Sequence, residues 1–136
     1  MAPPMNHGIT LSDIDSRESP WGGSDFMDRY VFPHGELAHV SVTLREMCSA
    51  GLEPMDVENL RRHYVLTLNH WATRFENAAA RLRGIVEEKR YRIWRVYLAG
   101  CAYGFAHNWM ALHQVLAVKA GVDALPLTRT YMYVGM

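Results

Sequence analysis

The clearest pattern along the chain is a pair of apolar stripes between residues 61 and 105. Apolar side chains of the first stripe recur three and four residues apart, at Tyr64, Leu68, Trp71, Phe75, Ala78 or Ala79, and Leu82. The second stripe has the same steps, at Tyr91, Trp94, Leu98, Cys101 and Phe105. This spacing is typical of amphipathic helices. Gly84 lies between the stripes as a stop signal, so the pattern predicts helices over about residues 60–83 and 87–106.

Two shorter apolar segments on either side of these helices predict strands. Residues 52–58 alternate in polarity, and Pro54 limits pairing at its own position. Met110 to Val118 is an almost unbroken apolar run, which is the pattern of a strand buried on both faces. We expect one edge of this second strand to be open, and an open apolar edge is a template for another chain. The sequence therefore predicts a homo-oligomer.

The segment before the first predicted strand contains a helix pattern and a long polar loop. Ser41 can cap a helix that ends before Gly51 and buries Leu44, Met47 and Cys48. Residues 10–35 are rich in turn-forming residues, apart from an apolar stretch over residues 25–32 that suits one short helical turn. The last residues, 120–136, predict an extended tail.

Composition excludes several classes of protein. The 136 residues suit a single domain, and 14 basic residues balance 14 acidic ones, which argues against a nucleic-acid partner. No apolar run reaches the length of a transmembrane helix, and the first residues do not have the pattern of a secretory signal. Cys48 and Cys101 are expected to be buried free thiols in a reducing cytosol. No Cys/His cluster has metal-ligand spacing, so no metal site is expected.

Several clusters occur together and in a fixed order between about residues 6 and 119. They are His7-Gly8-Ile9-Thr10, Pro20-Trp21, Asp28-Arg29-Tyr30-Val31-Phe32-Pro33-x-Gly35-Glu36-Leu37, Asp56-Val57-Glu58-Asn59, Tyr64-x-x-Thr67-Leu68-x-x-Trp71-x-x-Arg74-Phe75, Arg92-x-Trp94-x-x-Tyr97-Leu98-x-x-Cys101-x-x-x-Phe105 and Gln114-Val115. Together they resemble the carboxy-terminal part of the cyclopropane-fatty-acyl-phospholipid synthases. These S-adenosylmethionine-dependent methyltransferases are relatives of the mycolic acid cyclopropane synthases.

The resemblance implies an α/β, α-rich fold. It is the carboxy-terminal portion of a class I (Rossmann-like) methyltransferase fold, with the long helix pair inserted between the last two antiparallel strands. We expect a single partial domain with a leading loop (1–37), a helix and strand (38–60), a lid-like helix pair (61–106), the last strand (107–119) and a tail (120–136). In the family an apolar strand runs into the His-x-Ile motif, whereas here only Met5-Asn6 stands in its place. We therefore expect that strand to be nearly absent and the chain to be truncated at its amino end.

The resemblance also implies roles for particular residues. His7, Ile9 and Tyr64 stand at bicarbonate-site positions, while the family's glutamate and cysteine at that site lie upstream of anything present here. The aromatic residues expected to contact an acyl chain are Trp71, Phe75, Tyr91 and Trp94. Residue statistics leave structural alternatives open, because a lone histidine near a chain end is usually solvated and a tyrosine on an apolar stripe usually belongs to the core.

The implied reaction is methylene transfer from S-adenosylmethionine to a cis double bond of an unsaturated phospholipid acyl chain, with bicarbonate as the second cofactor. The chain has no glycine-rich turn after a strand and no following acidic residue for ribose. We therefore expect the chain alone to bind neither cofactor and to be inactive. The alternative is a non-catalytic helical module that binds lipid or protein.

Two basic clusters, Arg61-Arg62 and Lys89-Arg90-x-Arg92, are either solvated surfaces or contacts for anionic lipid head groups. The expected location is cytoplasmic, with a peripheral position at the inner membrane face as a further option. Besides lipid, the expected partner is either another copy of the chain or a missing amino-terminal half.

Overall fold

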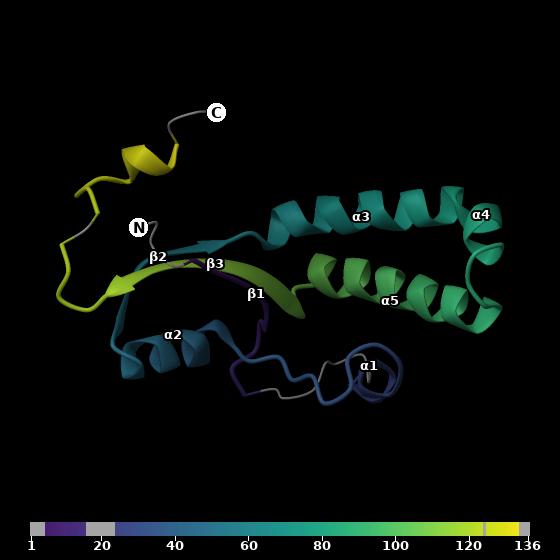
Figure 1. Cartoon of the computed structure of the whole chain (residues 1–136), viewed down its shortest axis with the longest axis horizontal. Coiled ribbons are helices and arrows are strands. Elements are labelled where there is room, and N and C mark those ends of the chain that lie inside the picture. Colours follow the sequence, from purple (N-terminus) through teal and green to yellow (C-terminus); the bar gives the residue numbers. More distant parts are fainter. Residues whose placement is uncertain (1–4, 16–23, 124, 134–136) are drawn as a thin grey trace.

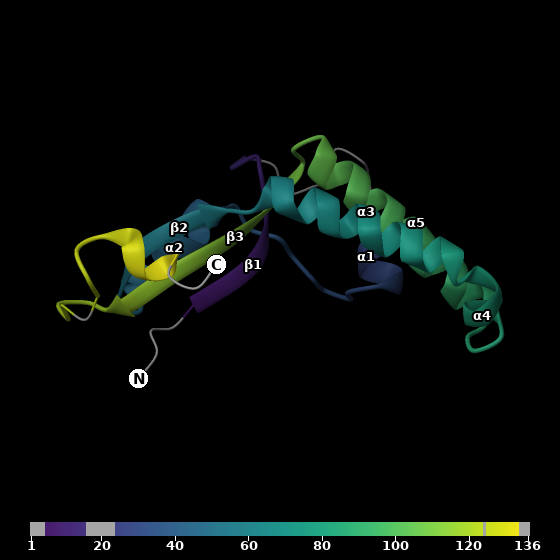
Figure 2. The ribbon, with the colours of Figure 1, turned by 90° about the horizontal axis from the view of Figure 1, so that it is seen from above.

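The computed structural model describes residues 5–15, 24–123 and 125–133. In chain order the elements are β1 (Met5–Leu11), α1 (Ser24–Tyr30), α2 (Val40–Ser49), β2 (Leu52–Asn59), α3 (Arg61–Asn77), α4 (Ala79–Arg83), α5 (Glu88–Ala106), β3 (Met110–Lys119) and the 3-10 turn η1 (Arg129–Met132). Figure 1 shows α2 lying along one face of a small sheet, while the α3–α5 helix pair projects from one end of it. The view from above shows sheet and helix pair as two successive parts of an elongated molecule (Figure 2).

The sheet has the order β1-β3-β2, and both pairings are antiparallel. The central strand β3 is buried on both faces, as its apolar run predicted, through Ala111, Leu112, Val115, Ala117 and Val118. The register of β2 shifts between Pro54 and Asp56. Proline has no N–H to donate to the ladder, which explains an irregularity at this point.

The two predicted long helices are confirmed, with one difference at the end of the first. Helix α3 ends at Asn77, and Ala78 separates it from the short α4, so the break precedes Gly84. The apolar stripes face each other: the ring of Phe75 stacks on that of Tyr91 with centroids 5.1 Å apart. An exposed ion pair between Arg95 and Glu76, with N–O distance 2.6 Å, joins α5 to α3.

One small cluster attaches the helix pair to the sheet. Leu68 of α3, Cys101 and Phe105 of α5, and Leu112 of β3 are all buried in it. Two hydrogen bonds close the same junction, from Leu60 N to Leu112 O (2.8 Å) and from Arg61 Nη1 to Phe105 O (2.8 Å). We call this set of contacts the junction. It fixes the direction in which the helix pair leaves the sheet.

The expectation that the first strand is nearly absent is wrong. β1 is a seven-residue strand that includes His7 and Ile9 and pairs with β3 along its whole length. Its polar residues Asn6, His7 and Gly8 gave no strand pattern. These residues form a strand because their backbone groups pair with those along the edge of β3. Leaving the N–H and C=O groups of a buried strand unpaired would cost free energy. β3 consequently has neighbours on both edges, and its predicted open edge does not exist.

Two further details differ from expectation, and two agree with it. Helix α2 begins at Val40 and its N-cap is His39, whose Nδ1 accepts a hydrogen bond from Ser41 N (3.2 Å), so Ser41 is not the cap. Cys48 is exposed, whereas Cys101 is buried; both are free. Gly51 has φ 77°, which confirms its role just past the helix end. The predicted short helical turn is present as α1.

The end of the described chain does not simply extend into solvent. Its 3-10 turn carries Arg129, whose Nε lies 2.5 Å from Oδ2 of Asp56 on β2.

In the described ranges, no helix combines the length and apolar character needed to cross a bilayer. The Pro20-Trp21 cluster and residues 1–4 lie outside the described residues.

Replacing Leu68 by alanine is expected to lower the free energy of unfolding by about 2–5 kcal/mol, because it opens a cavity in the junction. Leu66→Ala is the matched control on the same helix. Leu66 is 61% exposed and Leu68 is 2% exposed, so the control should change stability by about 0.5 kcal/mol or less. Urea unfolding followed by circular dichroism measures both. Equal losses in the two variants would contradict the assigned junction.

We expect the chain to self-associate through β1. Along its outer edge only Leu11 has a described backbone partner, Ala38 O at 3.1 Å, and the strand carries no charged residue. The outer edge of β2 is protected by Glu53, Pro54 and Glu58. Sedimentation equilibrium at micromolar concentration should therefore give a mass above 15.6 kDa.

Asn6→Lys places a charge on the β1 edge and should shift this association toward the monomer. Asn69→Lys makes the same change on an exposed position of α3 and should leave the mass unchanged. A single 15.6 kDa species for the unmodified chain would overturn the expectation.

Candidate functional site

His7 and Ile9 lie on one face of β1, because alternate residues of a strand point to the same side. His7 stands opposite Gln114 in the register, and Ile9 stands opposite Leu112. Gln114 Nε2 is 2.9 Å from His7 Nδ1. With the amide donating, Nδ1 is the acceptor, and the proton of the neutral imidazole sits on Nε2. The exposed side of His7 therefore offers an N–H donor.

The backbone carbonyl of Ile9 points away from β3. Leu11 N donates outward, to Ala38 O, and strand backbone groups alternate direction from one residue to the next, so Ile9 shares the outward direction of Leu11. The other side of the pairing agrees, because Leu112 O, opposite Ile9, accepts from Leu60 N beside β2 and not from β1. The Ile9 carbonyl is thus not used by the sheet ladder.

Tyr64 lies in the first turn of α3 and is half-buried against the junction. Its ring centroid is 4.9 Å from that of Phe105 and 6.0 Å from that of Trp71. Burial raises the pKa of the Tyr64 phenol above its ordinary value, and nearby Cys101 adds to the rise. The phenol therefore stays protonated at neutral pH and can donate a hydrogen bond.

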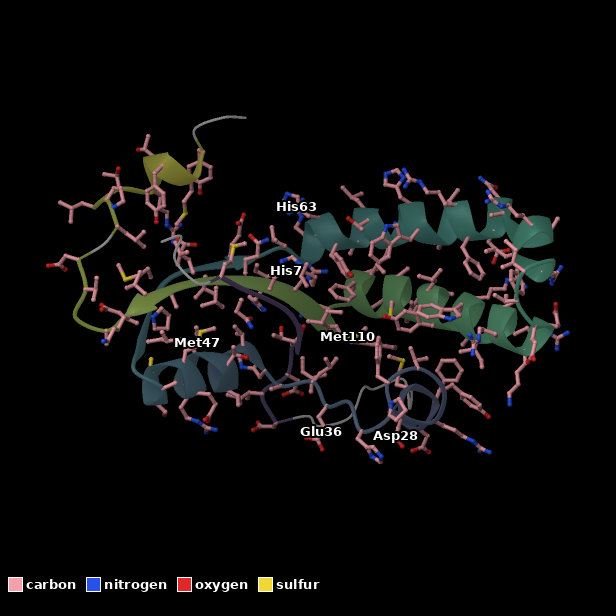
Figure 3. All side chains as sticks on the ribbon, in the orientation of Figure 1. His7, Asp28, Glu36, Met47, His63 and Met110 are labelled. Atoms are coloured by element: carbon pink, nitrogen blue, oxygen red, sulfur yellow. The ribbon has the colours of Figure 1, made fainter. Side chains whose placement is uncertain are left out.

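The structure brings Ile9 and Tyr64 to the same buried cluster, one from the sheet and one from the helix pair. His7 lies two residues further along β1, about 7 Å from Ile9 at the rise of an extended strand. Figure 3 shows His7 on the sheet and His63, the neighbour of Tyr64 in sequence, at the start of α3. His7 and Ile9 thus lie on β1 of the sheet, and Tyr64 meets Ile9 at the junction from the helix pair.

The four predicted acyl-chain residues fall into two pairs. Phe75 and Tyr91 pack between the helices, with Tyr91 only 1% exposed and the guanidinium of Arg83 4.5 Å above its ring. Trp71 and Trp94 are 46% and 43% exposed. Trp71 and Trp94 are therefore the more exposed pair, whereas Phe75 is only partly exposed and Tyr91 is buried.

The buried thiol of Cys101 and the phenol of Tyr97 belong to the same environment, although the sequence analysis gave neither of them a site role. Burial raises the pKa of Cys101, and the hydrogen bond with Tyr97 opposes that rise. Burial and then Cys101 raise the pKa of Tyr97 far above its ordinary value. Cys101 and Tyr97 are therefore uncharged at neutral pH, like Tyr64. Their helical spacing was visible in the sequence, but it carries no information on which neighbours they meet.

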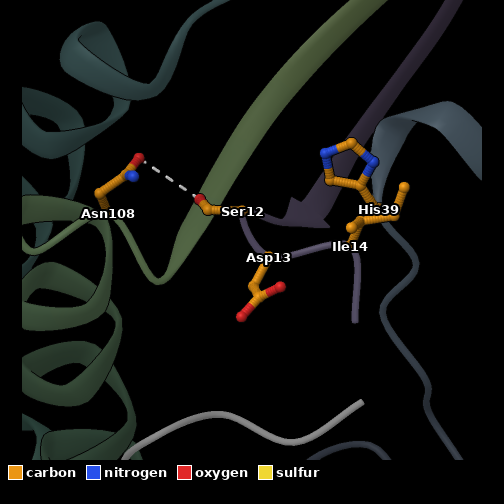
Figure 4. Close-up of a pocket in the computed structure, with 5 residues that line it drawn as sticks. All are labelled: Ser12, Asp13, Ile14, His39 and Asn108. Atoms are coloured by element: carbon orange, nitrogen blue, oxygen red, sulfur yellow. Dashed lines mark hydrogen bonds between the residues drawn. The ribbon is translucent and has the colours of Figure 1, made fainter. Parts of the chain in front are cut away.

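A separate polar cavity of about 420 Å³ opens beside the end of β1. Figure 4 shows its five lining residues, Ser12, Asp13, Ile14, His39 and Asn108. Nothing in the sequence pattern pointed to it, because its residues come from three separate segments. Over the described ranges, no three His, Cys, Asp or Glu side chains are grouped so that they could hold a metal ion.

The chain is similar to known lipid-modifying proteins. Residues 3–115 match the family model described as mycolic acid cyclopropane synthetase. A probable fatty acid methyltransferase from Pseudomonas putida is 53% identical over 132 residues, which cover 95% of this chain and 34% of that protein. A probable fatty acid methyltransferase from Mycobacterium tuberculosis is 38% identical over 130 residues, covering 90% and 29%. The chain thus spans about a third of the length of these curated relatives.

Solved structures show the same fold. A cyclopropane synthase from Mycobacterium tuberculosis superposes with a TM-score of 0.75 at 23% identity, over 85% of this chain and 43% of that one. A mycolic acid cyclopropane synthase complexed with SAH and CTAB gives a TM-score of 0.73 at 23% identity, over 83% and 42%. The fold is therefore a portion of the class I methyltransferase fold, as predicted. Since the family model matches most of its residues, the chain belongs to the mycolic acid cyclopropane synthetase family.

Proposed function

We propose that this chain supplies the acyl-chain-facing helix pair and part of a bicarbonate site in an S-adenosylmethionine-dependent methyltransferase or cyclopropane synthase acting on lipid acyl chains. The observation that carries this proposal is the outward Ile9 carbonyl, held on the strand that also presents His7 and beside the cluster that holds Tyr64. The names of the curated relatives, which are fatty acid methyltransferases, support the substrate class.

The donors of this region suit a small oxyanion. His7 offers Nε2–H when Nδ1 accepts from Gln114, and Tyr64 offers a phenolic O–H that burial keeps protonated. The Ile9 carbonyl accepts, so it suits the one protonated oxygen of bicarbonate. One acceptor for the O–H and two donors for the other oxygens complement that ion, and this complementarity supports assigning it here.

S-adenosylmethionine supplies the one-carbon unit when it is bound, but the described residues do not fit it. Their sheet is antiparallel throughout, with no strand that leads through a glycine-rich turn into a helix. We therefore assign this cofactor to no residue of the described chain. The chain's own contribution is to exclude water, to face the acyl chain and to position the proton acceptor.

The apolar walls near the junction suit this task. An alkene is a weak nucleophile, and a carbocation formed from it would be trapped by water. The uncharged groups Tyr64, Tyr97 and Cys101 keep that environment apolar. The exposed ring faces of Trp71 and Trp94 can stabilise positive charge as it develops.

Titration of the isolated chain with S-adenosylmethionine is expected to give no saturable heat, since the described residues offer no nucleotide cradle. The same titration of the 53%-identical Pseudomonas putida relative is the positive control. Methyl transfer by the isolated chain to unsaturated phospholipid should likewise be undetectable. A saturable isotherm, or turnover of radiolabelled S-adenosylmethionine, would refute the cofactor assignment.

Tyr64→Phe is expected to slow the reaction about 10- to 100-fold when the chain is joined to the cofactor-binding part of a family enzyme. This is the effect of losing one hydrogen bond to a charged group. Stability should change little, because the ring and its packing remain. Tyr103→Phe, on the half-exposed side of α5, is the matched control and should leave the rate unchanged. A lower melting temperature with full activity would make Tyr64 a core residue and favour the non-catalytic lipid-binding alternative.

A further inference from the structure

The end of the helix pair that lies farthest from the sheet is strongly basic. We call residues 79–92 the helix-pair tip. It carries Arg81, Arg83, Lys89, Arg90 and Arg92 against Glu87 and Glu88, a formal net charge of +3 in a chain whose total is zero. Figures 1 and 2 both show the tip at the opposite end of the helix pair from the sheet. The positive charge is thus concentrated at one extremity of the molecule.

Most of this positive charge is not neutralised locally. Glu88 forms ion pairs with both Arg83 (Nε–Oε2 3.1 Å) and Arg92 (Nε–Oε1 2.9 Å). The Arg92 hydrogen bond lowers the pKa of Glu88, which keeps this carboxylate charged. Within the part of the chain that the structure describes, Arg81, Lys89 and Arg90 have no acidic partner within ion-pair distance, and all three are exposed.

Apolar groups accompany these cations. Ile85, in the turn between α4 and α5, is 67% exposed. Residues of α1 and α5 also line a groove of about 420 Å³, in which apolar and charged side chains occur together: Phe26, Tyr30, Glu88, Lys89, Arg92, Ile93 and Val96. Lys89 Nζ lies 5.7 Å from the centre of the Tyr30 ring. Apolar and basic side chains in this arrangement match a lipid–water interface, where alkyl groups enter and cations meet phosphates.

We propose that the helix-pair tip docks on the surface of an anionic lipid bilayer, with Ile85 entering the interface and Arg81, Lys89 and Arg90 facing lipid phosphates. The inference rests on the proposed function for the identity of the partner, since an enzyme acting on phospholipid acyl chains has to reach the bilayer that holds them. A nucleic acid would use the cations but gain nothing from Ile85 or the apolar side chains of the groove. For that reason the bilayer is the better match.

Co-sedimentation with vesicles tests the electrostatic part. The unmodified chain should bind phosphatidylcholine vesicles that contain phosphatidylglycerol more tightly than vesicles of phosphatidylcholine alone, and added salt should weaken the difference. The double change Lys89→Gln and Arg90→Gln should weaken binding about 25-fold, at about fivefold for each basic residue lost near the surface. Arg62→Gln with Lys119→Gln removes two exposed cations next to the sheet and is the matched control, with no effect expected.

Ile85→Ser tests the apolar part and should weaken binding about tenfold, largely independently of salt. Leu66→Ser, at another exposed apolar position of the helix pair, should change it little. Circular dichroism checks that all variants keep their helices. Equal binding to both vesicle types, equal loss in the controls, or tighter binding to duplex DNA than to anionic vesicles would overturn the inference. The assay reads binding without turnover, so its failure would leave the Tyr64 test of the proposed function unaffected.

Discussion

The packing of Phe105 against Leu68 and Leu112 is the contact on which the arrangement of the molecule depends. Phe105 is fully buried, and its own carbonyl accepts the hydrogen bond from Arg61, so one residue joins the end of α5 to the start of α3 and to the sheet. Tyr64 and Ile9 pack on the same cluster. Any change that loosened Phe105 would therefore also separate the two sides of the proposed bicarbonate site.

Much of this fold could be predicted from sequence, because the helix pair and β3 owe their structure to local apolar patterns. A period of three and four residues located α3 and α5, and an unbroken apolar run located β3. β1 was missed since nothing in Asn6, His7 and Gly8 favours a strand; its structure comes from pairing with a partner more than a hundred residues away. The sequence analysis assigned the N-cap of α2 to Ser41 because serine is a common cap residue, whereas the cap is His39. A histidine can act as a cap only when its ring nitrogen faces a free backbone N–H, and this orientation is visible only in the structure.

The candidate site was predictable only in part, and the reason is geometric. His7, Ile9 and Tyr64 were chosen by resemblance. The position of His7 and Ile9 beside the cluster that holds Tyr64 required the register of β1 with β3. Periodicity put Trp71 and Phe75 on one stripe, and Tyr91 and Trp94 on the other. An apolar stripe includes residues at the centre of a helix–helix contact and residues at its edge. The pattern alone therefore could not distinguish the stacked pair, Phe75 and Tyr91, from the exposed tryptophans. The rise in the pKa of Cys101 and Tyr97 comes from burial among neighbours that only the folded chain provides.

Attachment at one end makes the helix pair a lever arm with the junction as its fulcrum. The 19 residues of α5 span about 28 Å at the rise of an α-helix. A rotation of about 5° at the junction would therefore carry the far end through about 2.5 Å, while Tyr64 beside the fulcrum would hardly move. A displacement imposed at the far end would thus move the residues of the proposed site very little. A small change in the packing of Phe105 would instead produce a large displacement at the far end.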